Sequence, residues 1–164
     1  MDSIEKFNKL SKTEFISIFG NIFEKTEWIA ERCHKFKPYK NLDELVSKMM
    51  ATFENTKKSK HLEILNSHPD LVIEKKLTKD SKNEQKGSSL NQCTAEEVME
   101  FKKLNKQYKE KFGFPFIIAV KGKNKEEILN NFRQRMTNDI NLEFEEAKKQ
   151  VKKIANFRLS EIIK

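Results

Sequence analysis

The stretch Thr94-Ala-Glu-Glu-Val-Met-Glu-Phe-Lys-Lys-Leu-Asn-Lys-Gln-Tyr-Lys-Glu-Lys-Phe112 decides the fold class. Thr94-x-x-Glu97 has the spacing of a capping box, in which the two side chains bond free backbone N–H groups at a helix start. Behind it, large apolar side chains recur every three or four residues: Val98, Phe101, Leu104, Tyr108 and Phe112. This period places them on one face of a helix. We therefore predict a long helix that buries one face.

Similar signals recur on both sides of this stretch. Ser11-x-x-Glu14 is a second capping box, and Asn41 is typical of a third helix start. The capping box at Ser11 is followed by apolar residues at helical spacing: Phe15, Ile18, Phe19, Ile22 and Phe23. The helix start at Asn41 is followed by Leu42, Leu45, Met49 and Phe53. We predict further helices from about Lys125 and from about Ile140 to the C-terminus.

Two other segments indicate where helices stop. One carries Leu62 and Leu65 and must end near His68, because the residue before a proline avoids the helical region. The other, Phe114–Val120, is almost wholly apolar and too short for a helix of its own. We expect it to be a buried extended strand or linker.

Length and composition favour one compact helical protein. The chain has 164 residues, enough for a single domain with a real core, and only four glycines and three prolines to interrupt helices. Thirteen phenylalanines argue against disorder. We find no internal repeat and no linker-like change in composition. The prediction is an all-α fold: a single domain over residues 1–164, built as a bundle of six to eight helices.

The charge pattern bears on the partners. The formal net charge is +8, but the lysines are interleaved with 25 acidic residues, which indicates solvated helix faces more than a nucleic-acid surface. Cys33 and Cys93 form no disulfide framework, and no apolar stretch has the length of a membrane span or a signal-peptide core. We expect a soluble cytoplasmic protein that binds neither nucleic acid nor membrane.

An imidazole stands beside a rigid turn in His68-Pro69-Asp70-Leu71, thirteen residues before the polar run Ser81-Lys82-Asn83-Glu84-Gln85. Together with the aromatic run Phe112-Gly113-Phe114-Pro115-Phe116, these are ingredients of an acid/base site that needs no metal or cofactor. A lone histidine near a helix end also often just satisfies a backbone carbonyl. We take His34 and His61 as surface residues, and with no third ligand evident we predict no metal site.

Two polar positions each allow two interpretations. Ser81 and Glu84 have capping-box spacing, which needs no active site, yet the same helix start would suit an anionic substrate. Arg158 continues the apolar stripe of the last helix, formed by Phe144, Ala147, Val151 and Ile154. Its guanidinium either clamps a carboxylate or ureido group or extends its head outward to solvent. The spacing alone leaves both interpretations open.

Several motifs follow one another in a specific order along nearly the whole chain. They are His68-Pro69-Asp70-Leu71, Leu77-Thr78, Ser81-x-x-Glu84-Gln85, Leu104-Asn105-x-x-Tyr108, Phe112-Gly113-Phe114-Pro115-Phe116-Ile117, Glu143, Ala147, Ile154-Ala155 and Arg158-Leu159. In this order they resemble the OHCU decarboxylase family, whose members act in urate degradation on 2-oxo-4-hydroxy-4-carboxy-5-ureidoimidazoline (OHCU). One departure is Ser88-Ser89, where the family usually has Ala-Gly. If Ser89 adopts a positive φ, it would cost roughly 1 kcal/mol.

The resemblance implies an all-helical homodimer that converts OHCU to (S)-allantoin and carbon dioxide without a cofactor. It implies that His68 is the catalytic proton donor, and the chemistry assigns Glu84 to orient the imidazole. Implied substrate-binding residues are Pro69, Ser81, Lys82, Asn83, Gln85, Phe116, Ile117, Ile118, Ala119, Val120 and Arg158. Two alternatives remain: a basic helical module that binds nucleic acid or an acidic partner, and a decarboxylase of this fold for a related ureido compound.

Overall fold

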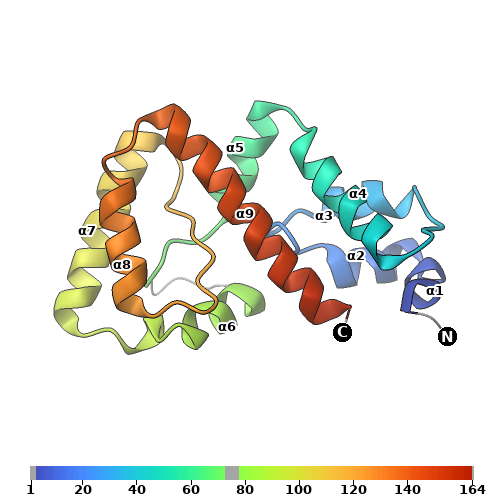
Figure 1. Ribbon diagram of the computed structural model, residues 1–164, viewed down its shortest axis with the longest axis horizontal. Helices are drawn as coiled ribbons and strands as arrows, with labels where there is room; N and C mark the ends of the chain where they lie inside the picture. Colours follow the sequence, from blue (N-terminus) through green and yellow to red (C-terminus); the bar gives the residue numbers. More distant parts are fainter. Residues whose placement is uncertain (1–2, 73–77, 164) are drawn as a thin grey trace. The chain divides into compact units, whose positions relative to one another are not determined.

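The computed structural model describes residues 3–72 and 78–163, so Leu77 of the motif series lies outside the described residues. Within these ranges the regular structure consists of nine α-helices and one 3-10 helix, and the all-α prediction is confirmed. The elements are α1 Ser3–Asn8, α2 Lys12–Phe19, α3 Glu27–His34, α4 Leu42–Glu54, α5 Lys58–Ser67, α6 Lys79–Gly87, η1 Leu90–Gln92, α7 Ala95–Phe112, α8 Lys125–Arg135 and α9 Ile140–Ile162 (Figure 1). The count exceeds the expected six to eight by one, because α1 precedes the first capping signal.

The capping boxes form as the sequence predicts. Ser11 and Glu14 exchange both of their bonds at the start of α2, and Thr94 and Glu97 do so at the start of α7. Asn41 caps α4 by accepting the Glu44 N–H at 2.8 Å. Each cap satisfies donors that the first helical turn leaves free.

Helix α2 ends earlier than its apolar spacing suggests. Gly20 is its C-cap, and a Cβ added there would stand 2.5 Å from the Ile16 carbonyl oxygen. Ile22 and Phe23 are buried all the same, in the turn that follows. The apolar spacing therefore extends past the end of α2, because Ile22 and Phe23 pack in the core although they are not helical.

The chain divides into two compact units. The N-terminal unit takes residues from 1–64 and 152–164, and the central unit is 65–151, with the boundaries inside α5 and α9. In the N-terminal unit, α3 packs against both α2 and α4. The Phe23 and Phe53 rings stack there with centroids 4.9 Å apart.

Both histidines that we took as surface residues are in the N-terminal unit, and for His61 that prediction is wrong. His61 is buried, its Nε2 lies 2.7 Å from the Phe53 carbonyl oxygen, and its ring packs on the Phe53 ring. An imidazole can be buried here because a backbone oxygen at the end of α4 satisfies it. His34 is half-buried, with its ring edge-on to Phe15.

An aromatic cluster forms the core of the central unit. Helices α7 and α8 lie side by side, and the run Phe114–Val120 passes beside them as a buried segment with neither helix nor strand pairing in the described structure (Figure 1). The Phe116 and Phe132 rings stack at 3.9 Å, and Tyr108 meets both edge-on. Such contacts add about 0.5–1.5 kcal/mol per pair to the burial of the rings.

No helix among the described residues combines the length and the apolar character that crossing a bilayer demands.

Candidate active site

His68 lies at the C-terminal end of α5, where the sequence predicts that the helix stops. The helix ends at Ser67, and the His68 backbone N–H donates to the Leu65 carbonyl at 3.2 Å. The His68 side chain is 7% exposed. Pro69 follows and removes the donor that a continuing helix would need. The imidazole is therefore buried beside a rigid turn.

The turn after His68 is held by side chains of the central unit. Gln85 uses both ends of its amide: Oε1 accepts the Val72 N–H at 3.2 Å, and Nε2 donates to the Asp70 carbonyl at 3.3 Å. Asn105 of α7 donates to the Leu71 carbonyl at 2.9 Å. These bonds hold Val72 at φ +53°, a strained conformation for a β-branched residue.

Helix α6 begins at Lys79, two residues before Ser81, and the interpretation of Ser81 and Glu84 as a capping box is wrong. The N-cap is Thr78, whose hydroxyl accepts the Ser81 N–H at 3.2 Å. A threonine three residues ahead of Ser81 supplies a cap of the same kind, so Ser81 falls inside the first turns of the helix. Its side chain is consequently buried.

One face of α6 carries the buried polar residues. Ser81, Gln85 and Ser88 are buried, and Glu84 is half-buried on the same face, as spacings of three and four residues require. Lys82 and Asn83 are exposed on the other side of the helix. Of the run from Ser81 to Gln85, the inward-facing residues are thus Ser81, Glu84 and Gln85.

The C-terminal end of α6 is linked to the buried segment Phe116–Val120. The Ser88 hydroxyl donates to the Val120 carbonyl at 2.6 Å. Ser89 next to it has φ +61° and ψ +18°, which confirms the positive φ considered at this departure from the family pattern. The bond and the left-handed turn together fix where α6 ends relative to Val120.

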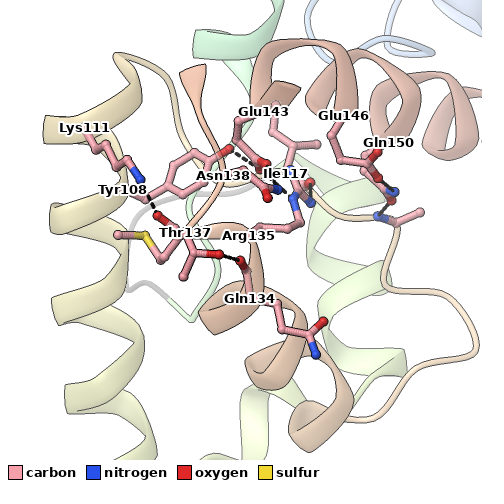
Figure 2. A network of polar contacts seen from close by, with 12 residues as sticks. Tyr108, Lys111, Ile117, Gln134, Arg135, Thr137, Asn138, Glu143, Glu146 and Gln150 are labelled. Atoms are coloured by element: carbon pink, nitrogen blue, oxygen red, sulfur yellow. Dashed lines mark hydrogen bonds and ion pairs between the residues drawn. The ribbon is translucent and has the colours of Figure 1, made fainter. Parts of the chain in front are cut away.

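Side chains of α8 and α9 bind the same segment at Ile117 and Ala119. Arg135 Nη1 donates to the Ile117 carbonyl at 2.6 Å, and Gln150 Oε1 accepts the Ala119 N–H at 2.9 Å (Figure 2). Arg135 also lies over the Phe116 ring, 4.4 Å from its centroid. The five side chains expected to bind substrate here, Phe116 to Val120, are all buried.

Arg135 is itself fixed by a buried carboxylate. Glu143 Oε1 accepts from Arg135 Nε at 2.5 Å and from the Tyr108 hydroxyl at 2.7 Å, and Oε2 accepts from Asn138 at 3.0 Å (Figure 2). Burial, and then the bond to Glu143, raise the pKa of the Tyr108 phenol. Sequence reasoning gave Arg135 and Gln150 no role. One signal in the sequence could have found such residues. Helical spacing places Arg135, three residues after Phe132, and Glu143, four residues before Ala147, on the apolar faces of their helices.

Arg158 belongs to the N-terminal unit, where it pairs with a buried acid. Its Nη2 lies 2.8 Å from Glu24 Oε2, and Nη1 donates to the Asn21 carbonyl at 2.7 Å. The side chains of Arg158 and Glu24 are 5% and 1% exposed, so the guanidinium does not extend outward to solvent. Glu24 and Lys25 both have positive φ, and the bonds to Arg158 and Asn21 stabilise this turn.

The central unit contains four of the expected elements: His68, the Pro69 turn, the inner face of α6 and the segment Phe116–Val120. Hydrogen bonds join Gln85 of α6 to the turn and Ser88 to Val120. Arg158 lies in the other unit, and Lys82 and Asn83 face solvent. In residues 3–72 and 78–163, no three His, Cys, Asp or Glu side chains gather closely enough to hold a metal ion. The polar groups of the central unit described above are an imidazole, carboxylates, amides and buried backbone groups.

The chain is similar to known proteins over nearly its whole length. A sequence model of the OHCU decarboxylase family matches residues 8–160. A 2-oxo-4-hydroxy-4-carboxy-5-ureidoimidazoline decarboxylase of Haloferax volcanii is 35% identical over 159 residues, 97% of this chain and 95% of that protein. A uric acid degradation bifunctional protein of Bacillus sp. TB-90 is 39% identical over 164 residues, and there the chain spans only 33% of the relative's length.

A solved structure shows the same fold. The crystal structure of (S)-allantoin synthase superimposes with a TM-score of 0.81 at 28% identity, covering 100% of this chain and 54% of that one. The family match covers most of the chain, and the Haloferax relative covers it at nearly equal length. The resemblance seen in the motifs is confirmed, and the chain belongs to the OHCU decarboxylase family.

Proposed function

We propose that this chain decarboxylates OHCU to (S)-allantoin and carbon dioxide, without a cofactor, with residues 1–164 acting as one domain. The observation that carries the proposal is the burial of His68 in a turn that Gln85 of α6 holds by two hydrogen bonds. A buried imidazole beside a rigid turn suits proton transfer in a water-poor site. Relatives named for this reaction match the chain at nearly full length.

The proposed chemistry needs one proton delivered to one face of the ring. The C–C bond to the carboxylate breaks, carbon dioxide leaves, and the electron pair stays on the imidazoline ring. His68 then donates a proton to the ring carbon, and Glu84 holds the imidazole in one orientation. Exclusion of water by the buried segment Phe116–Val120 strengthens the polar contacts and prevents random protonation.

Substrate binding is assigned to the remaining expected residues. Pro69, Ser81 and Gln85 would fix polar atoms of the substrate beside His68. Lys82 and Asn83 face solvent, so we give them at most a contribution through their backbone. The role of Arg158 in substrate binding stays a prediction from the resemblance, and its pair with Glu24 fixes the guanidinium in one orientation.

The test is turnover of OHCU generated freshly from urate by the two preceding enzyme reactions. Circular dichroism follows whether one enantiomer of allantoin accumulates faster than the racemic product of spontaneous decay. We expect His68→Asn to lose on the order of 10²–10⁴ in turnover while it stays folded. His34→Asn is the matched control, since His34 is half-buried in the N-terminal unit and has no assigned role.

The alternatives are outcomes of the same assay. Racemic product at the background rate from the wild-type chain would contradict the proposal and favour a related ureido substrate or a binding function. Near-normal turnover in His68→Asn would contradict the role of His68 alone. We also propose that the protein is a cytoplasmic homodimer. Light scattering on the protein as it elutes from a size-exclusion column tests the dimer by measuring its mass.

A further inference from the structure

The backbone of Phe116–Val120 is buried without the partners that a sheet would supply. It forms no strand pairing in the part of the chain that the structure describes. Buried N–H and C=O groups require partners, so side chains must provide them. Arg135 bonds the Ile117 carbonyl, Gln150 bonds the Ala119 N–H, and Ser88 bonds the Val120 carbonyl. The position of this segment is therefore set by side chains of three helices or their ends.

The two bonds from α8 and α9 are themselves anchored. Glu143 holds Arg135 through Nε and also accepts the Tyr108 hydroxyl, so α7, α8 and α9 meet at one carboxylate (Figure 2). Gln150 donates its Nε2 to Glu146 at 2.9 Å, which fixes which end of the amide faces Ala119. An arginine held by two acceptors at once has little freedom to rotate.

Two of these bonds lie close together along the segment. The Ile117 carbonyl and the Ala119 N–H are two residues apart, and both are bound by side chains of α8 and α9. These side chains therefore hold the middle of the segment in place.

We infer that Arg135, Glu143 and Gln150 are positioning residues, which hold the backbone of Phe116–Val120 in the place where the substrate binds. The inference rests on the proposed function, which assigns the segment to the substrate site.

The first test is Gln150→Met, which keeps the side-chain length and removes the acceptor for the Ala119 N–H. We expect KM for OHCU to rise roughly tenfold, the effect of about one misplaced hydrogen bond. We expect kcat to stay within about twofold, because a contact made equally in ground and transition state changes KM alone. Gln134→Met is the matched control, since Gln134 is exposed on α8.

The second test is Arg135→Lys, which keeps the charge beside Glu143 but cannot bond Glu143 and the Ile117 carbonyl in the same fork. It should raise KM in the same way. Arg133→Lys is its control, because Arg133 lies on the same helix, is about half exposed and pairs with Glu100 and Asn130 at the surface. If Gln150→Met does not fold, the KM of Arg135→Lys tests the inference in its place.

Amide hydrogen exchange at Ala119, measured without substrate, separates this inference from the proposed function. In Gln150→Met the Ala119 amide should exchange at least tenfold faster, with the urea midpoint close to that of Gln134→Met. Unchanged exchange would overturn the inference, and so would faster exchange with an unaltered KM. If the wild-type chain fails to turn over OHCU, the proposed function fails, and the expected effect on KM is lost with it. The exchange result still reports whether Gln150 holds the segment.

Discussion

The carboxylate of Glu24 lies 2.8 Å from the Arg158 guanidinium, although the two residues are 134 positions apart in the chain. Glu24 is 1% exposed and stands in a turn where its own φ is +64°. Within the N-terminal unit, this pair ties the turn after α2 to the last turns of α9. A buried charge needs its partner, because either ion alone would remain desolvated.

Glu24→Gln should therefore destabilise the protein strongly. It leaves the Arg158 charge buried without its counter-ion, and we expect a loss of about 3–5 kcal/mol in the free energy of unfolding by urea. Changing Arg158→Gln in the same chain should recover part of the loss, because the uncompensated charge is removed. Glu31→Gln breaks the exposed pair with Lys12 and should change little. Equal effects of the Glu24 and Glu31 changes would contradict the importance of burial.

The N-cap of α6 supports the face that carries Glu84 and Gln85. Thr78→Ala removes the acceptor for the Ser81 N–H and should cost about 1 kcal/mol in unfolding by urea. Thr78→Ser keeps a hydroxyl and should cost much less. If Ser81 were the cap, as its spacing to Glu84 predicts, both changes at Thr78 would be nearly silent.

Local signals predicted most of the helices correctly. The boxes at Ser11 and Thr94 and the cap at Asn41 depend on residues within one turn of each other, so the sequence alone reveals them. The stop before His68 depends only on Pro69. The start of α6 was misplaced because Thr78 and Ser81 are both residue types that cap helices, and the local sequence does not decide between them.

The site could be predicted only in part, for a physical reason. The order of the motifs pointed to His68 and to the segment Phe116–Val120, because each of them lies within a continuous stretch of sequence. The bonds that hold them join residues far apart in the chain, such as Arg135 with Ile117 and Ser88 with Val120. No periodicity encodes such pairs. For the same reason the sequence left Arg158 open between two roles, and the structure gives it a buried partner, Glu24.

Ser89 occupies a left-handed position that glycine would adopt without strain. Ser89→Gly should raise the free energy of unfolding by up to about 1 kcal/mol, because the Cβ is disfavoured at φ +61°. Gly113→Ala is the opposite test: it has φ +82° with no atom within 4 Å of an added Cβ, so the cost of about 1 kcal/mol is conformational. Urea unfolding of both variants checks the sign. A loss of stability in Ser89→Gly would show that the serine side chain contributes more than the backbone strain.

The pair between Glu97 and Lys125 should give the fold a pH-dependent link from α7 to α8. The two charges lie 2.9 Å apart. The hydrogen bond from the Thr94 backbone, and then the bond from Lys125, lower the pKa of the Glu97 carboxyl. The bond to Glu97 raises the pKa of the Lys125 ammonium. A lowered acid pKa contributes stability that is lost as pH falls through the folded value, and a raised lysine pKa contributes stability that is lost as pH rises through its folded value.

Glu97→Gln isolates this contribution, because glutamine at the same position can still complete the capping box. The urea midpoint of the wild type should exceed that of the variant near neutral pH. The difference should shrink below about pH 4 and again above about pH 10, the ordinary titration ranges of the two groups. In a Lys125→Met background the same change should have a smaller effect at neutral pH, since the charge partner is gone. A difference that stays constant from about pH 3 to about pH 9, a range that spans the titration of the carboxyl group, would contradict a contribution from the charge of Glu97.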